Sequence, residues 1–451
     1  MVRFSRLAAR ANYPVARVAN LLKRRPQYGA NERGLDRTDV SQMRYVRITD
    51  VDSAGRLVPG LGATAEVADN RYLLNDADIL LARSGNTAGK SYMYSVADGP
   101  AIFAGYMIRF AFDPSKIVPA FAFIYTQLPV YHLWVQATRR LTGQPNINAE
   151  EYRSLTIPIP PVDVQRQVIA QFQRAMTAYN QAEAEAAALL ASIDDYLLSE
   201  LGIVLPPETE NTLANRTFRV SAHELGGWRF DPYHHQTCFH KFDDALQGGK
   251  HPLSSLRNAY RALVNGYDCR DFVEDGLPYL RVAQVKPFNL KIEDAQAIPV
   301  SGVPARGLAL MGDLLLTRKG TYGDAALNRS DTPFAFSSEV FRIRLNPSKL
   351  NGDYAEAVLN SVLVRTQFKR HSIGAIMGSL SQSIFGKIQI PLPPIDEQQR
   401  IAEYCQIIRG HAKVLEAKAT AELETAKREI EAILLDSPKQ LHQPQNSFAL
   451  G

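Results

Sequence analysis

Two glycine-containing turns carry side chains that can bind a phosphate backbone. SGNTAGKS covers residues 84–91 and follows the apolar run DILLAR, and KGTYGDA covers residues 319–325 and follows DLLLTR. Glycines let a loop approach a phosphate closely, while hydroxyl, amide and basic side chains can donate hydrogen bonds to it. Glycine-rich turns are often only turns, so the prediction of nucleic-acid contacts depends on their recurrence. The candidate contact residues are Arg83, Ser84, Asn86, Thr87, Lys90, Arg318, Lys319, Thr321 and Tyr322.

A second group of basic and polar residues precedes the last short helix expected in each half of the chain. Its members are Arg139, Arg140, Gln144 and Asn146 in the first half, and Lys369, Arg370, His371, Ser379 and Gln382 in the second. Charged clusters are more often solvated surface than binding sites. Because the cluster occurs in both halves, we include these residues among the candidate DNA contacts.

The sequence shows no recognisable catalytic motif. FDPY at 230–233 is the closest phrase to the Asn-Pro-Pro-aromatic motif of adenine methyltransferases, but it lacks the second proline. The spacing of Gly85, Gly89 and Lys90 does not fit a G-x-x-x-x-G-K-[ST] phosphate loop. YHHQTCFH at 233–240 could supply zinc ligands, yet its spacing matches no zinc finger. We therefore expect no catalytic, cofactor or metal site in this chain.

The elements that position the turns occur twice. IPIPPVDVQRQVIAQF at 157–172 and IPLPPIDEQQRIAEY at 390–404 align with a constant offset of 233 residues. FDPSKI at 112–117 and LNPSKL at 345–350 keep the same offset, and Asp78 and Asp313 before the turns differ by 235. An accidental match would not hold its register over such distances. The 451 residues therefore form two similar halves, each long enough to bury its own core.

Composition is that of an ordinary globular protein, with 45% hydrophobic and 22% charged residues and no apolar run of membrane-spanning length. The basic N-terminus lacks the continuous apolar segment of a signal peptide. Three cysteines without metal-type spacing fit a reducing interior, so we expect a cytoplasmic protein. A net charge of +5 permits a nucleic-acid partner without requiring one.

The proline pairs at 160–161 and 393–394 predict where two long helices begin, because proline disfavours a helix before it and supplies no backbone donor. Asp163 and Asp396 are expected to cap these helices, with Gln399 completing a capping box in the second.

Each helix is expected to run for about 39 residues, to near Leu201 and Leu434, with one apolar stripe at helical spacing. The first stripe is Val168, Phe172, Ala175, Tyr179, Ala182, Ala186, Leu189, Ile193 and Leu197. The second is Ile401, Cys405, Ile408, Ala412, Leu415, Ala419, Leu423, Ala426, Ile430 and Ile433. Matched stripes favour a coiled coil of the two helices over two helices that each pack only on their own half.

The predicted fold class is α+β, with two similar β-rich mixed domains separated by the two helices. Alternating segments such as YVRI at 45–48 and YLRV at 279–282 indicate strands, and Asn148 and Ser381 are expected to cap the last short helix of each domain. The expected divisions are a first domain at 1–161, helices at 162–202 and 395–436, a second domain at 203–394, and a flexible tail at 437–451.

The duplicated IPxPPxxxQ junctions, the twofold LLxRxG turns and WRFDPYHH at 228–235 resemble the DNA specificity subunit of type I restriction-modification systems. The resemblance covers nearly the whole chain. It implies two target recognition domains that each read one part of a split, asymmetric double-stranded DNA site. It also implies that the two long helices lie antiparallel as a spacer and bind two methyltransferase subunits, to which restriction subunits can add. S-adenosylmethionine is then expected in the partner methyltransferase, and no cofactor in this chain. Val164, where the second copy has Glu397, departs from the family's usual acidic residue.

Two other functions stay open from the residues alone. The chain could have a latent nuclease or transferase activity of its own, which would be detected in the purified chain. It could instead be a helical scaffold without a DNA role, which would show no salt-dependent DNA affinity. The recognised bases depend on loop geometry and do not follow from the sequence.

Overall fold

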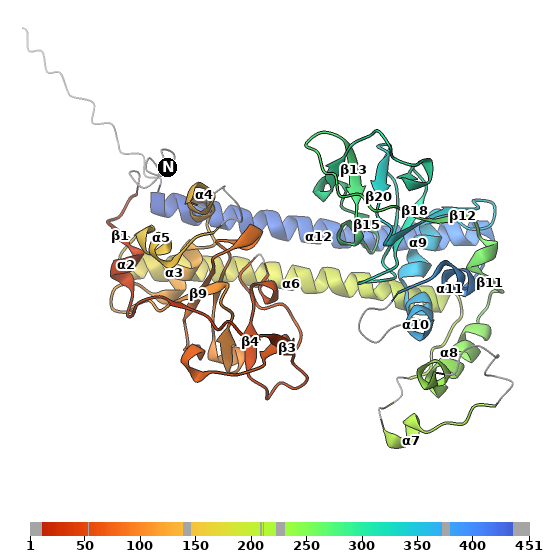
Figure 1. The fold of residues 1–451 in the computed structure, drawn as a ribbon, viewed down its shortest axis with the longest axis horizontal. Helices are drawn as coiled ribbons and strands as arrows, with labels where there is room; N and C mark the ends of the chain where they lie inside the picture. The colour runs from red at the N-terminus through yellow and green to blue at the C-terminus, as the bar shows by residue number, and fades with distance from the viewer. Residues whose placement is uncertain are drawn as a thin grey trace, which may run out of the picture. The chain divides into compact units, whose positions relative to one another are not determined.

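The computed structural model describes residues 11–52, 54–138, 146–207, 210, 212–221, 231–371 and 379–435. The chain divides into two compact units. Unit 1 comprises Met1–Glu183 and Glu416–Gly451, and unit 2 comprises Ala184–Leu415. The two long helices, α6 (Val162–Glu200) and α12 (Ile395–Leu435), each contribute residues to both units (Figure 1). The tail expected at 437–451 lies outside the described residues.

Unit 1 packs short strands against short helices and the adjoining parts of α6 and α12. Its strands are β1 (Val15–Arg17), β2 (Gln27–Tyr28), β3 (Gly34–Asp36), β4 (Arg44–Val46), β5 (Ala63–Ala65), β6 (Ile79–Ala82), β7 (Ser91–Met93), β8 (Ala101–Phe103), β9 (Met107–Phe110) and β10 (Thr156–Pro158). Its α-helices before α6 are α2 (Val18–Leu21), α3 (Pro119–Tyr125), α4 (Pro129–Thr138) and α5 (Ala149–Ser154). The central sheet has the order β2-β9-β6-β7.

Unit 2 has the same kinds of elements. Its strands are β11 (Leu253–Ser255), β12 (Tyr260–Asn265), β13 (Leu277–Leu280), β14 (Val285–Lys286), β15 (Asn289–Leu290), β16 (Gln296–Ile298), β17 (Leu308–Ala309), β18 (Leu314–Thr317), β19 (Ala325–Leu327), β20 (Phe334–Phe336), β21 (Val340–Leu345) and β22 (Gln389–Pro391). Its short α-helices are α7 (Leu213–Arg216), α8 (Thr237–Gln247), α9 (Gly352–Asn360), α10 (Val362–His371) and α11 (Gln382–Lys387).

The central sheets of the two units have equivalent strand orders, because β12-β21-β18-β19 in unit 2 matches β2-β9-β6-β7 in unit 1. The register matches too: Leu81 lies opposite Ile108, and Leu316 lies opposite Phe341. Asn148 and Ser381 cap α5 and α11 as predicted, since their side chains accept hydrogen bonds from Glu151 N–H and Ile384 N–H. The α+β class and the duplication are confirmed.

The long helices have the predicted extent, with 39 residues in α6 and 41 in α12. Every residue of both predicted stripes is buried or half-buried. In unit 2 the helices run antiparallel, because Arg400 binds Glu200 at 2.7 Å while the Tyr196 and Tyr404 rings lie 4.3 Å apart. In unit 1 Gln171 donates to Glu429 at 2.8 Å. The stripes also contact the domain core of the same unit, so both predicted packing partners are used.

The predicted helix caps were wrong in position. The helices begin at Val162 and Ile395, directly after the proline pairs, so Asp163 and Asp396 lie inside the first turn. The carbonyls of Pro161 and Pro394 accept the first helical hydrogen bonds, from Gln165 N–H at 3.0 Å and Gln398 N–H at 2.9 Å. Proline can take this place because its fixed φ suits the approach to a helix. Both carboxylates lie in the first turn, where the helix dipole favours negative charge.

The repeated glutamine of the junction motif joins each long helix to its domain. Gln165 accepts from Val118 N–H at 2.9 Å and donates to Pro160 O at 2.9 Å. Gln398 accepts from Asn351 N–H at 2.9 Å and donates to Pro393 O at 2.8 Å and Lys349 O at 3.1 Å. Both side chains are almost fully buried. The motif therefore marks a fixed connection between domain and helix.

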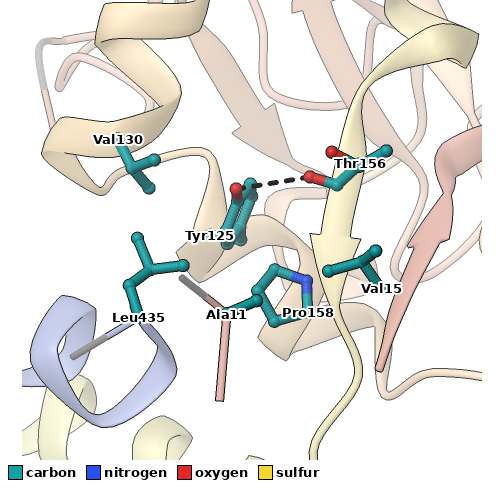
Figure 2. A pocket seen from close by; sticks show the side chains of 7 residues that line it. All are labelled: Ala11, Val15, Tyr125, Val130, Thr156, Pro158 and Leu435. Carbon is teal, nitrogen blue, oxygen red and sulfur yellow. Dashed lines mark hydrogen bonds between the residues drawn. The ribbon is translucent and has the colours of Figure 1, made fainter. Parts of the chain in front are cut away.

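The end of α12 meets the first described residues of the chain. Asn12 N–H donates to Leu434 O at 3.0 Å, just as Lys250 N–H donates to Leu201 O at 2.9 Å in unit 2. Beside this contact Leu435 lines a small pocket together with Val15, Val130 and Tyr125, whose hydroxyl donates to Thr156 O at 3.3 Å (Figure 2). The segment around Asn12 thus contacts the C-terminal end of α12 in the same way as the segment around Lys250 contacts the C-terminal end of α6.

Among the described helices, none is both long and apolar enough to cross a membrane. Nor do three or more His, Cys, Asp or Glu side chains come together in the described ranges in a way that could hold a metal ion.

Candidate nucleic-acid interface

The turn of unit 1 is shaped by two glycines. Strand β6 ends at Ala82, and Gly85 and Gly89 then adopt φ values of 70° and 93°. Residues other than glycine rarely adopt these backbone angles. A Cβ on Gly89 would also lie 2.6 Å from the γ-carbons of Val135 on α4. The turn therefore needs glycine at residue 89 both for its backbone angle and for its close contact with α4.

The turn of unit 2 has the same geometry. Gly320 and Gly323 have φ values of 72° and 94°, and a Cβ on Gly323 would lie 2.9 Å from the ring of Phe368 on α10. Phe368 lies 233 residues after Val135, so the packing position is the repeated one. The two turns are built alike although only part of their sequence is shared.

In each unit the structure pairs the turn with one residue of the second predicted cluster. In unit 1 Ser84 forms a β-bridge with Asn146, and Arg83 O accepts from Ile147 N–H at 2.8 Å. In unit 2 Lys319 forms the equivalent bridge with Ser379, and Arg318 O accepts from Leu380 N–H at 2.9 Å. Residues about 60 positions apart thus form one surface in each unit.

Arg83 and Arg318 occupy equivalent places, each half-buried at the end of a central strand. The Arg83 guanidinium carbon lies 4.9 Å from the centroid of the Tyr28 ring, and its buried Nε makes no hydrogen bond within the described residues. Arg318 donates to Ser338 O at 3.2 Å and lies 5.6 Å from the Phe341 ring centroid. Arg318 Nε also donates to Leu380 O at 3.4 Å. Both arginines keep further guanidinium donors that can reach a phosphate or a base edge.

Some candidates have their polar groups engaged inside the protein. Lys90 donates through its ammonium group to Val51 O, and burial lowers the pKa of its amine. Arg370 binds Asp243 at 2.5 Å and donates to His234 O at 3.0 Å. Thr87 donates to Ser84 O at 3.2 Å within the turn. These contacts position the turns and the helix α10.

The other candidates differ in exposure, and some lie beyond the described part of the chain. Lys319, Thr321, Lys369 and Gln382 are exposed, and Gln382 donates to Asn265 Oδ1 at 2.6 Å. Tyr322 packs partly on the core, the His371 ring lies 5.0 Å from the His234 ring, and Asn86 belongs to the 3-10 turn Gly85–Thr87. Arg139, Arg140 and Gln144 lie outside the described residues.

Four further residues border these sites and had not been anticipated: Tyr28, Tyr106, Asn265 and Glu339. Their main-chain positions correspond between the units, but their side-chain types differ. Comparing the halves for shared residues could not reveal them, because the equivalent positions share no identity. Only the strand register brings them next to the arginines.

Sequence comparisons with known proteins point to one family. The model of the type I restriction modification DNA specificity domain matches residues 34–210 and 308–425. The type I restriction enzyme MjaVIII specificity subunit of Methanocaldococcus jannaschii is 20% identical over 380 residues, covering 82% of this chain and 81% of that protein. The putative MjaX specificity subunit of the same organism is 19% identical over 374 residues, covering 82% and 80%. The solved type I S subunit from M. genitalium matches with a TM-score of 0.40 and 11% identity, covering 95% and 97%.

Proposed function

This chain belongs to the family of type I restriction-modification DNA specificity domains, and from that premise we propose that each of its units reads one half of a bipartite, asymmetric DNA site. The observation that carries the proposal is the repeated site. Each unit places one arginine, one glycine-shaped turn and one bridged polar segment in the same arrangement. Two similar readers in one chain suit a site with two separate halves.

The residues proposed to contact DNA are those around Arg83 and Arg318. Turn residues with exposed polar groups, such as Lys319 and Thr321, can donate to phosphates or base edges. Lys90 and Arg370 are proposed to act mainly by holding these elements in place, since their charged groups bind Val51 O and Asp243. Substituting them should change stability more than base preference.

We propose that the chain is not itself an enzyme and acts through two methyltransferase subunits docked on α6 and α12. These partners would supply S-adenosylmethionine and the methyl transfer, and restriction subunits could join them. Support comes from the exposed apolar side chains Tyr404, Ile407 and Val414, which follow helical spacing along α12 within unit 2. An exposed apolar stripe on a helix is suited to binding another helix. The cytoplasm, where genomic DNA is accessible, is the proposed compartment.

The proposal is tested by mapping methylated bases in a host that lacks related systems. Expressing the chain with its methyltransferase subunit should produce one bipartite methylated motif, and omitting either component should abolish it. The purified chain alone should neither methylate nor cut DNA. Methyl transfer or cleavage by that chain, after removal of contaminating subunits, would favour an enzyme. The absence of salt-dependent DNA binding by the complex would favour a scaffold.

A further inference from the structure

The main-chain hydrogen bonds and strand pairs around Arg83 and Arg318 are the same in both units, and together they form a shared frame. Arg83 N–H donates to Tyr106 O at 2.9 Å, and Arg318 N–H donates to Glu339 O at 2.9 Å. On the other side, Tyr28 lies opposite Ile108 in the β2–β9 ladder, as Asn265 lies opposite Phe341 in the β12–β21 ladder. Residues 28 and 265 are therefore equivalent, and so are residues 106 and 339.

The side chains on this shared frame differ in chemistry. Unit 1 has two tyrosines beside Arg83, and 40% of Tyr28 and 64% of Tyr106 are exposed. Unit 2 has a carboxylate and an amide instead, from the exposed Glu339 and the half-buried Asn265.

The polar side chains of unit 2 are held in place by a hydrogen-bond network. Gln382 donates to Asn265 Oδ1 at 2.6 Å, and Asn265 donates to Ser338 O at 3.4 Å. The same Ser338 carbonyl accepts from Arg318 at 3.2 Å, and the Ser338 hydroxyl donates to Asp268 at 2.6 Å. A carbonyl oxygen has two lone pairs, so Asn265 Oδ1 can accept a second hydrogen bond. The network fixes the amide next to the arginine.

We propose that residues 28 and 106 in unit 1, and the equivalent residues 265 and 339 in unit 2, determine which bases each unit reads. This inference rests on the proposed function. Asn265 and Glu339 can accept hydrogen bonds from an exocyclic amino group of adenine or cytosine in the major groove. Tyr28 and Tyr106 offer apolar ring surface that suits the methyl group of thymine. Arg83 and Arg318 are the contact common to both units, and Gln382 is a positioning residue.

The test exchanges the side chains between the units in the full chain bound to its methyltransferase. The first variant combines Tyr28→Asn with Tyr106→Glu, and the second combines Asn265→Tyr with Glu339→Tyr. Methylated motifs are then mapped in the host. Each exchange should change or relax the bases of one half-site, by about tenfold or more in preference at the affected position, while the other half-site and the gap stay as they were.

Single alanine variants test the proposal even if the double exchanges fail to fold or lose activity. Tyr28→Ala, Tyr106→Ala, Asn265→Ala and Glu339→Ala remove side chains that are exposed or half-buried, and the affinity of each complex is measured on duplexes that carry every single-base change in the motif. Discrimination should fall at one or two positions of one half-site. A matched control combines Val67→Asn with Val96→Glu, at two exposed residues of unit 1, and should leave every preference unchanged.

The outcomes separate this inference from the proposed function. Unchanged base preferences in all exchange and alanine variants would overturn the assignment while the bipartite motif of the natural chain still stands. A uniform loss of affinity on all duplexes would overturn it as well, because it indicates phosphate contacts only. If the natural chain and its methyltransferase produce no motif at all, the proposed function itself fails.

Discussion

At the scale of single residues, the two sites combine a shared anchor with different neighbours. Arg83 and Arg318 are held by equivalent backbone hydrogen bonds, whereas the side chains that border them are aromatic in unit 1 and polar in unit 2. The arginine position was visible in the sequence because its type is repeated. Its neighbours were not, because they come from strands far away in the chain and differ in type.

Replacing either arginine should weaken DNA binding by the assembled complex. Arg83→Ala and Arg318→Ala each remove one cation, so the slope of log affinity against log salt should fall by ~0.9 if the contact is to a phosphate. Arg83→Lys keeps the charge and should keep most of the slope. Titrations at several salt concentrations measure the effect, with Arg71→Ala, at an exposed arginine of unit 1, as control. An unchanged affinity and slope in both alanine variants would remove these arginines from the interface.

The turn glycines should be sensitive to the smallest substitution. Gly89→Ala and Gly323→Ala combine a disfavoured φ with a clash against Val135 or Phe368, so each should destabilise its unit by about 2 kcal/mol or more. Gly410 is the matched control, because it lies exposed within α12 with open space at its Cβ. Gly410→Ala should stabilise by about 0.5–1 kcal/mol. Urea unfolding measures whether each variant is less stable or more stable than the natural chain.

At the scale of elements, the junction between each domain and its long helix depends on one buried glutamine. Gln165 and Gln398 each satisfy a backbone N–H of their domain and a proline carbonyl before the helix. A buried polar group without its partner is costly. This explains why both junctions have a glutamine, although the pattern of apolar residues alone would be compatible with many other residue types.

Substituting the junction glutamine should loosen the domain from its helix. Gln398→Met keeps the size of the side chain but leaves Asn351 N–H and two carbonyls without their partner. The free energy of unfolding of unit 2 should therefore fall by about 2–3 kcal/mol. Gln165→Met should have a similar or smaller effect in unit 1. Gln399→Met, at the neighbouring exposed residue, is the control and should be nearly neutral. Equal stability of all three variants in urea would contradict a structural role for the junction.

At the scale of the whole molecule, α6 and α12 are the elements that continue from one unit into the other. We expect them to set the gap between the half-sites. Inserting four helix-forming residues near Ala186 to Ala188 adds ~6 Å of rise, against ~3.4 Å per base pair. The methylated motif should therefore keep both half-sites while its gap grows by about one or two base pairs, with some loss of affinity because four residues break the stripe register.

Sequencing the motifs methylated by the insertion variant and its partner measures the gap. An active variant with an unchanged gap, or with altered half-site bases at the old gap, would refute the spacer role. Twisting of the DNA can absorb part of the added rotation, so the gap length rather than the affinity is the decisive quantity.

The sequence by itself determined the features that depend on local or repeated information. The constant offset established two similar halves, the spacing of apolar residues gave the extent of α6 and α12, and Asn148 and Ser381 marked the last short helices. The family resemblance followed from the repeated junctions and is confirmed by the family model. These features were accessible because each is encoded within a short window or by a comparison of two windows.

Only the tertiary structure decided which residues lie next to Arg83 and Arg318. Strand pairing and packing bring Tyr28 and Tyr106 beside Arg83, turn the charges of Lys90 and Arg370 toward internal partners, and start the long helices at the residue after the proline pairs. Each of these outcomes depends on contacts between segments distant in sequence. Sheet register and the competition of several partners for one buried group determine such contacts. Neither can be predicted from the residue pattern of a short segment.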